Sequence, residues 1–158
     1  KDGSNCFGKG TRFEASQKRI WAFFKSAKKL LKPPPGLPRR PLTNFDIAKY
    51  CSKMKFFRGV FMHDELPRKP WKNESFVMNL HSKEKPGSHW VSVLKRGDKV
   101  LYFDSYGQIP PSNALAKYLK GCQIKYNFDR FQKLDNSFNC GHLCISFLKK
   151  YSEWKPKQ

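Results

Sequence analysis

Apolar positions along the chain fall into short periodic runs, separated by turns rich in Pro, Gly and polar residues. The first run follows Thr11, which with Glu14 three residues later fits a helix capping box. Behind this cap, apolar side chains recur at spacings of three and four residues, which predicts a helix over about 12–31. The opposite face is basic, and fits either a solvated face or a surface for nucleic acid or membrane. The apolar set is Ile20, Phe23, Phe24, Ala27, Leu30 and Leu31.

The segment 32–41 contains five prolines and cannot form a helix or a central strand, so we expect a semi-rigid extended linker. Thr43 then fits the N-cap of a second helix, with Asp46 at its third position. Its apolar face would consist of Ile47, Tyr50, Cys51 and Met54. We therefore expect two parts, a basic N-terminal helix with its linker over 1–41 and a folded domain over 42–158.

The remaining apolar runs predict both strands and helices. Strands are indicated by alternation and by β-branched and aromatic residues, and helices by spacings of three and four. The runs predict a short extended piece over 56–62, strands over 75–81 and 122–128, and helices over 113–120 and 140–151.

A hairpin is the clearest local prediction. Two alternating strands, 89–96 and 99–104, are joined by a two-residue turn that begins with glycine. This turn sets a register in which Val91 faces Asp104. Because His89 lies two residues before Val91, the two share a face, and His89 becomes a diagonal neighbour of Asp104. Such neighbours lie about 7–8 Å apart, which is close enough for an imidazole and a carboxylate to form a hydrogen bond.

Cys140 ends a polar, turn-prone stretch and begins the helical run over 140–151. Unpaired backbone N–H groups and the macrodipole at a helix start favour a thiolate. We therefore hypothesise that Cys140 is a catalytic nucleophile, with His89 as its base and Asp104 orienting the imidazole. The alternative is a surface histidine, an aspartate in a turn and a buried cysteine.

Gln132 lies eight residues before Cys140. Its side-chain amide could donate a hydrogen bond to a developing oxyanion beside the Cys140 backbone N–H. The alternative is an ordinary solvated glutamine in a polar loop.

The charge of the chain is strongly positive. Its 158 residues include 32 Lys and Arg against 12 Asp and Glu, a net charge of +20 and a pI of about 10.0. Residues 1–60 hold 15 of the basic and three of the acidic residues, hence +12 of the total. This asymmetry favours the N-terminal part as a surface for a polyanion, most plausibly nucleic acid. Solubility alone is the competing explanation.

The five cysteines are odd in number and show no regular disulfide spacing, so we expect a reducing compartment. No apolar run reaches the ~18 residues of a membrane span, and no signal peptide is visible. The candidate ligands for a zinc site are Cys122, Cys140, His142 and Cys144. The last three alternate along one helix and would spread their side chains around it, so we expect no metal.

At these residues the chain resembles the adenovirus-type cysteine proteases (adenain), within the wider group of SUMO- and ubiquitin-like-protein proteases. The resemblance covers about 42–151 and is nearest to versions in large DNA transposons and related DNA viruses. It implies an α/β (α+β), papain-like fold, with a mixed central sheet flanked by helices and the nucleophile at a helix N-terminus. The matching pieces are His89-Trp90-Val91-Ser92-Val93, Leu101 to Gly107, Gln132, and Asn136 to Cys144.

The resemblance implies a His89–Asp104–Cys140 triad with Gln132 as oxyanion donor. Two features depart from the family: Asp104 stands where adenain has Glu, and the spacing from Gln132 to Cys140 is longer than usual. The family's substrate channel further implies that three residues contact the substrate, with the first forming an aromatic wall. These residues are Trp90, Gly87 and Asn139.

The family also implies a function. We expect a thiol endopeptidase that cleaves viral capsid or core precursors at Gly-containing sites during virion maturation, with autocatalytic cleavage. DNA would act as a cofactor, no cofactor would be tightly bound, and the enzyme would be a monomer in the virion and host nucleus without a membrane association. The first alternative is a deSUMOylating or deubiquitinating protease acting on host ubiquitin-like tails. The second is a non-catalytic, basic DNA-binding protein.

Adenain is activated by a basic peptide ending in Cys-Phe, which forms a disulfide with the protease. The N-terminal part of this chain carries Cys6-Phe7 in a basic context, and Cys122 lies 18 residues before Cys140, the spacing of the activator-linked cysteine in the family. The resemblance therefore implies that residues 1–31 act as a built-in activator, which a Cys6–Cys122 disulfide would link to the protease domain. The alternative is two unrelated free thiols.

Overall fold

The chain divides into two compact units, Lys1–Leu30 and Leu31–Gln158. A computed structural model describes residues of the second unit only, and all structural statements concern these residues. The predicted helix over 12–31 thus lies outside the described residues, apart from Leu31. The described ranges are 31–84, 88–107, 109–127, 129–132 and 138–157.

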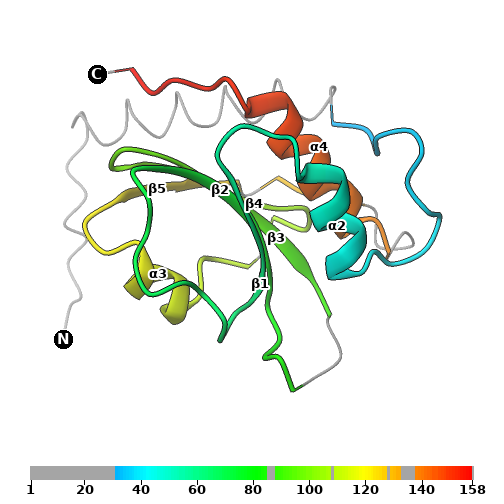
Figure 1. Ribbon diagram of the computed structural model, residues 1–158, viewed down its shortest axis with the longest axis horizontal. Coiled ribbons are helices and arrows are strands. Elements are labelled where there is room, and N and C mark those ends of the chain that lie inside the picture. The colour runs from blue at the N-terminus through cyan, green and yellow to red at the C-terminus, as the bar shows by residue number, and fades with distance from the viewer. Residues whose placement is uncertain (1–30, 85–87, 108, 128, 133–137, 158) are drawn as a thin grey trace, which may run out of the picture. The chain divides into compact units, whose positions relative to one another are not determined.

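A five-stranded mixed sheet forms the centre of the second unit, with the strands in chain order from edge to edge (Figure 1). The inner pairs β2–β3 and β3–β4 are antiparallel, and the outer pairs β1–β2 and β4–β5 are parallel. The strands are β1 (Phe57–Met62), β2 (Asn73–Asn79), β3 (Trp90–Arg96), β4 (Lys99–Asp104) and β5 (Gln123–Tyr126).

The predicted hairpin is confirmed as β3 and β4. Val91 pairs with Asp104 and Arg96 pairs with Lys99, so the register is the one that the two-residue turn predicts. The turn glycine, Gly97, has φ of +60°, a conformation that glycine adopts without a steric penalty. Every residue of β3 is buried, so the centre of the sheet is covered on both faces.

Three described helices pack on the sheet. Thr43 and Asp46 form the predicted capping box at α2 (Asn44–Cys51), where the Asp46 N–H donates to Thr43 Oγ1 at 3.2 Å and the Thr43 N–H donates to Asp46 Oδ2 at 2.8 Å. Ser112 caps α3 (Asn113–Tyr118). The last helix, α4 (Cys140–Tyr151), has the predicted bounds.

The helices cover opposite faces of the sheet (Figure 1). On one face, α4 lies along the central strands, and Phe147 stacks on Phe103 of β4 with ring centroids 4.8 Å apart. On the other face, Leu115 and Leu119 of the α3 segment join a buried cluster with alternate residues of the strands. Because successive strand residues point to opposite faces, the two faces form two separate apolar layers.

Two strands are placed differently from the prediction. The strand expected over 75–81 ends at Asn79, because Asn79 Oδ1 accepts the backbone N–H groups of His81 and Ser88 and so turns the chain into a loop. The strand expected over 122–128 ends at Tyr126, because the next residue, Asn127, binds the backbone of β4 instead of continuing the ladder.

The Pro-rich segment belongs to the second unit and is packed on α4. Ser146 Oγ donates to the Lys32 carbonyl at 2.6 Å, and the His142 ring binds the Pro38 carbonyl at 2.7 Å. Both partners, His142 and Ser146, lie one turn apart on α4, so the segment crosses over this helix. Among the described residues, no helix combines the length and apolar character needed to cross a bilayer.

Candidate active site

His89 and Asp104 meet at the end of the hairpin that the sequence predicted. His89 Nε2 lies 2.6 Å from Asp104 Oδ1, and both side chains are buried. The short distance matches a charge-assisted hydrogen bond rather than a neutral one. The shared face and the register therefore produce the contact that was expected from the turn alone.

Asp104 is held in place by the chain around it. Its Oδ1 also accepts the Tyr106 N–H at 3.0 Å, and its Oδ2 accepts the Ile109 N–H at 2.9 Å. Burial works against the charged form, but the hydrogen bonds from His89 and from these two N–H groups outweigh it and lower the pKa of Asp104. Asp104 is thus a fixed carboxylate directed at one edge of the imidazole.

Asn127 fixes the backbone of the same residue. Its Oδ1 accepts the Asp104 N–H at 2.9 Å, and its Nδ2 donates to the Asp104 carbonyl at 2.5 Å. On the β5 side, β4 has no strand partner at Asp104, and the Asn127 side chain makes the backbone hydrogen bonds there instead. The side-chain amide keeps the end of β4 in register while the chain turns away.

Cys140 is the first residue of α4 and is buried. The N-cap residue, Asn139, makes no side-chain hydrogen bond to the first turn, whereas α2 and α3 both have side-chain caps. The first-turn N–H groups of α4 are thus not neutralised by a cap, and their dipoles face the thiol. This start of α4 is a favourable place for a negative charge.

The thiol and the imidazole are electrostatically paired. Burial raises the pKa of Cys140, but hydrogen bonding to His89, backbone hydrogen bonds from Trp90 and Gly141, and the positive charge of His89 lower it overall. For His89, burial lowers the pKa, while hydrogen bonds to Asp104 and Cys140 and their charges raise it to about 9. Because Asp104 occupies Nε2, the other ring nitrogen serves Cys140. The arrangement favours a thiolate–imidazolium pair at neutral pH.

Trp90, the first residue of β3 and the neighbour of His89, binds both α4 and the segment before α2. Its indole N–H donates to the Leu42 carbonyl at 3.0 Å, and its own carbonyl accepts the Cys144 Sγ–H at 3.3 Å. At Gly141 there is little room for a side chain, since a Cβ atom would lie 3.2 Å from both Trp90 Cδ1 and Leu42 Cβ. The glycine after Cys140 thus allows the start of α4 to approach Trp90 closely.

Gln132 lies buried beside the end of β4. Its Oε1 accepts the Ser105 hydroxyl at 2.8 Å, and its backbone N–H donates to the Ser105 carbonyl at 3.0 Å. The side-chain amide is therefore oriented by Ser105, and only its NH₂ end can donate to another group. Gln132 is not the solvated loop residue of the alternative interpretation.

The other expected site residues have different outcomes. Asn139 is the N-cap residue next to Cys140, and its contact with substrate stays a prediction. Trp90 is 7% exposed, and its role as a channel wall also stays a prediction. Gly87 lies outside the described residues, as does Cys6. Cys122 carries a free, half-buried thiol, and its disulfide with Cys6 stays a prediction.

His142 differs from what its position suggested. Its place in the helix predicts a partly exposed side chain, but the side chain is buried under the Pro-rich segment and binds the Pro38 carbonyl. Within the described ranges, no three His, Cys, Asp or Glu side chains converge on a possible metal position.

Three contributors to the site were missed by sequence reasoning: Tyr106, Asn127 and Ser105. Tyr106 stacks on the His89 ring, with centroids 4.7 Å apart and an angle of 26° between the planes. The hairpin register already placed it opposite His89, which was a usable signal. Asn127 and Ser105 act through contacts more than 20 residues apart in sequence, and no local pattern marks such contacts.

The fold matches two solved structures of a viral enzyme. The crystal structure of the ASFV pS273R protease is 16% identical, with a TM-score of 0.50, and the match covers 98% of this chain and 84% of that one. Its selenomethionine form is 18% identical, with a TM-score of 0.52 and coverage of 96% and 75%. No family model and no curated protein matches the sequence. The chain thus has the mixed α/β fold of that protease, with a cysteine at the start of a helix as expected.

Proposed function

We propose that this chain is a cysteine endopeptidase in which Cys140 is the nucleophile. The observation that carries the proposal is the buried line of groups from Asp104 through His89 to Cys140. A carboxylate, an imidazole and a thiol in this order form the constellation of nucleophilic acyl transfer. The likeness of the fold to a viral protease adds support.

The pairing defines the first half of the reaction. The Cys140 thiolate attacks the carbonyl carbon of the scissile peptide bond, and the carbonyl electron pair moves to oxygen. The oxyanion then collapses, the C–N bond breaks, and His89 gives its proton to the leaving amine. The products of this half are a free amine and a thioester on Cys140, and His89 is now neutral.

Water completes the cycle. Neutral His89 takes a proton from a water molecule, which attacks the thioester carbonyl. The C–S bond breaks, the acid product leaves, and the thiolate–imidazolium pair is restored. Throughout these steps Asp104 holds the ring through Nε2 and stabilises its positive charge, which a buried imidazolium requires.

The oxyanion requires hydrogen-bond donors. In this proposal the backbone N–H of Cys140, at the uncapped start of α4, is one donor. The amide NH₂ of Gln132 is the second, since Ser105 holds the opposite end of that amide. Donors fixed in advance in a buried site stabilise developing charge without reorganisation.

For the substrate we propose Gly-containing sites in viral precursor proteins, with DNA as a cofactor and with the virion and host nucleus as the place of action. Support comes from the family resemblance, from the viral source of the matching fold, and from the net charge of +20. Hydrolysis of ubiquitin-like tails is the second candidate, because it requires the same triad. A purely DNA-binding role explains the charge but gives no reason for a paired thiolate in a buried site.

The test is cleavage of fluorogenic Gly-containing peptides and ubiquitin-like precursors by the full chain, with and without DNA, at several salt concentrations. We expect peptide cleavage that is absent in Cys140→Ala, is raised by DNA, and loses its DNA dependence as salt rises. Lys149→Ala, at an exposed position of α4, provides the control, since it keeps the triad and every cysteine. Cleavage that persists in Cys140→Ala would contradict the proposed nucleophile, and cleavage of ubiquitin-like tails without DNA dependence would favour the second candidate.

A further inference from the structure

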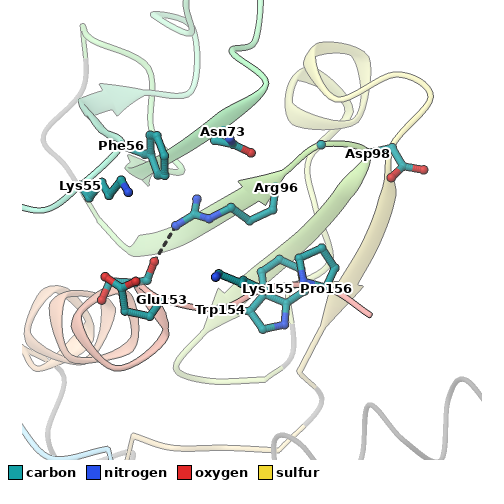
Figure 2. A pocket seen from close by; sticks show the side chains of 11 residues that line it. Lys55, Phe56, Asn73, Arg96, Asp98, Glu153, Trp154, Lys155 and Pro156 are labelled. Atoms are coloured by element: carbon teal, nitrogen blue, oxygen red, sulfur yellow. Dashed lines mark hydrogen bonds between the residues drawn. The ribbon is translucent and has the colours of Figure 1, made fainter. Parts of the chain in front are cut away.

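β3 carries the site at one end and a buried arginine at the other. The strand begins at Trp90, directly after His89, and ends at Arg96. At about 3.3 Å per residue, the seven residues of β3 put Arg96 roughly 20 Å from the imidazole. The arginine borders an open hollow of about 500 Å³ (Figure 2). The hollow is lined by Lys55, Phe56, Asn73, Gly97, Asp98 and residues 152–156.

The guanidinium of Arg96 joins three segments of backbone. Nη1 donates to the Lys95 carbonyl at 2.8 Å and to the Glu74 carbonyl at 3.4 Å, and Nη2 donates to the Ser152 carbonyl at 2.8 Å. Ser152 is the C-cap residue of α4. A cation at this position also interacts favourably with the negative end of the helix dipole.

Phe56 also contacts Arg96, and the carboxylate of Glu153 lines the same hollow. The guanidinium lies over the Phe56 ring, 5.0 Å from its centroid. Phe56 has φ of +64°, and among the described residues it is the only non-glycine residue with positive φ. A bulky side chain rarely adopts this conformation, and such strain persists only where surrounding contacts maintain it. In this case the strained backbone directs the ring onto the arginine.

α4 and β3 are therefore tied at both ends. At the site end, the Cys144 thiol donates to the Trp90 carbonyl and Cys140 pairs with His89. At the far end, Arg96 holds the carbonyl of Ser152. The 12 residues of α4 span about 18 Å, which is close to the length of β3. The apolar face of α4 already packs on the sheet, where Phe147 stacks on Phe103, and the Arg96 tie adds a directional bond that fixes the far end of the helix against β3.

We propose that Arg96 is a remote positioning residue for the thiolate–imidazolium pair, acting through the α4–β3 angle; this rests on the proposed function of Cys140 and His89. The two partners are carried separately by the start of α4 and the start of β3. A small rotation about the site end would change their hydrogen-bond geometry, and displacements of about 1 Å can cost roughly 100-fold in rate. Removal of the Arg96 tie weakens the ion pair without removing any group that touches substrate.

The first experiment measures the rate of alkylation of Cys140 by iodoacetamide against pH, followed on the Cys140 peptide by mass spectrometry. This readout requires no substrate, so it is independent of whether the chain cleaves peptides. In Arg96→Ala we expect the acid limb of the profile to move to higher pH, with alkylation at neutral pH lowered by about 10-fold. Where cleavage is measurable, kcat falls and KM changes little, because no substrate contact is removed.

Arg58→Met is the matched control. Arg58 is a half-buried arginine that binds Glu74, Tyr118 and the Lys69 carbonyl, and none of these partners lies on α4. Its loss destabilises the fold by removing the ion-pair partner of the buried Glu74 carboxylate, which then keeps only the hydrogen bond from the Tyr118 hydroxyl. We expect the pH profile of Cys140 to stay at the wild-type position in this variant, because general destabilisation does not alter the α4–β3 angle.

Guanidinium ion provides a rescue test. Because the Arg96 site opens into the hollow, low concentrations of added guanidinium can enter the space left in Arg96→Ala and restore the acid limb. Phe56→Gly is a second variant that relieves the positive φ and removes the ring from the arginine, and it should shift the profile in the same direction by less. A wild-type profile in folded Arg96→Ala, or an equal shift in Arg58→Met, overturns the proposal. If Arg96→Ala does not fold, an unshifted profile in Phe56→Gly overturns it.

Discussion

The imidazole of His89 lies nearly parallel to the phenol ring of Tyr106, with centroids 4.7 Å apart and 26° between the planes. The face of an aromatic ring attracts a cation, so this contact stabilises the protonated form of His89. Tyr106 also donates its backbone N–H to Asp104 Oδ1, so one residue supports both partners. The backbone contact survives any side-chain substitution, which allows the two effects to be separated.

Replacement of Tyr106 by Leu should lower the pKa of His89 and the rate of Cys140 alkylation at neutral pH. A cation–π contact of about 0.5–1 kcal/mol corresponds to a roughly two- to fivefold change. Tyr106→Phe keeps the ring and should behave like the wild type. Equal effects of Phe and Leu would show that the hydroxyl, not the stack, is what matters.

Asp104→Asn should lower the rate far more than Tyr106→Leu. The amide is close in shape, but it carries no charge to stabilise the imidazolium, and its NH₂ group would face a backbone N–H of Tyr106 or Ile109. We expect kcat to fall by about 10²-fold or more, by analogy with the effect of this substitution in serine-protease triads. Titration of the imidazole by NMR should show a lower pKa for His89. An unchanged His89 titration would contradict the electrostatic role of Asp104.

The pH profile of activity should be bell-shaped and broad. On the acid side, kcat/KM rises as Cys140 loses its proton, at a pH below the ordinary thiol range because its pKa is lowered. On the alkaline side it falls as His89 loses its proton near pH 9. A thiol with an ordinary pKa would instead give an acid limb near the alkaline one, and hence a narrow optimum.

The same pKa change has a consequence for stability. His89 binds its proton more tightly in the folded chain, where its pKa is about 9, than in the unfolded chain, where it is about 6.5. Its contribution to the free energy of unfolding is complete below about pH 6.5 and is lost as pH rises through about 9. The lowered pKa of Cys140 also stabilises the folded chain, but this contribution changes with pH in the opposite direction: it is complete above the ordinary thiol pKa and is lost as pH falls through the lowered pKa. Urea unfolding of His89→Ala and Cys140→Ala across this range should show opposite differences in slope from the wild type.

Gly141→Ala should impair the site more than the fold. Alanine favours a helix by about 1 kcal/mol over glycine, but its Cβ would lie 3.2 Å from Trp90 and Leu42, both of which are buried. The start of α4 or these two side chains must therefore shift by a few tenths of an ångström, next to Cys140 and His89. We expect a stability within about 1 kcal/mol of wild type and a loss of kcat of at least about 10-fold, measured by thermal unfolding and peptide cleavage. An alanine at the exposed Lys149 of α4 serves as the control and should alter neither quantity.

Gln132→Ala should lower kcat by about 10²-fold with little change in KM, as removal of one oxyanion donor does in other acyl-transfer enzymes. Ser105→Ala leaves the glutamine in place but removes the hydroxyl that orients it. Ser105→Ala should therefore also lower kcat, but by less than Gln132→Ala does. If Ser105→Ala lowered the rate while Gln132→Ala did not, Gln132 would have no part in the chemistry.

Local rules predicted the parts of this fold that depend on neighbouring residues. The two-residue turn at Gly97 determined the β3–β4 register, and the register brought His89 to Asp104. The Thr43 cap and the bounds of α4 also follow from short-range patterns. The contacts that were missed join distant segments. Asn127 and Ser105 bind groups 23 and 27 residues away, and His142 is buried by a carbonyl 104 residues away.

The Pro-rich segment also bears on when the site can form during synthesis. Carbonyls of Lys32, Pro38 and Leu42 bind side chains that are 114, 104 and 48 residues further along the chain. The first two of these partners lie on α4, the last helix described, which also carries Cys140. On the ribosome, the early segment must therefore wait for α4 before its contacts can close, and pairings so distant in sequence form slowly. Because His89 and Asp104 precede Cys140 in the chain, the nucleophile is the last of the three to be synthesised, and its environment is complete only once α4 has packed against β3.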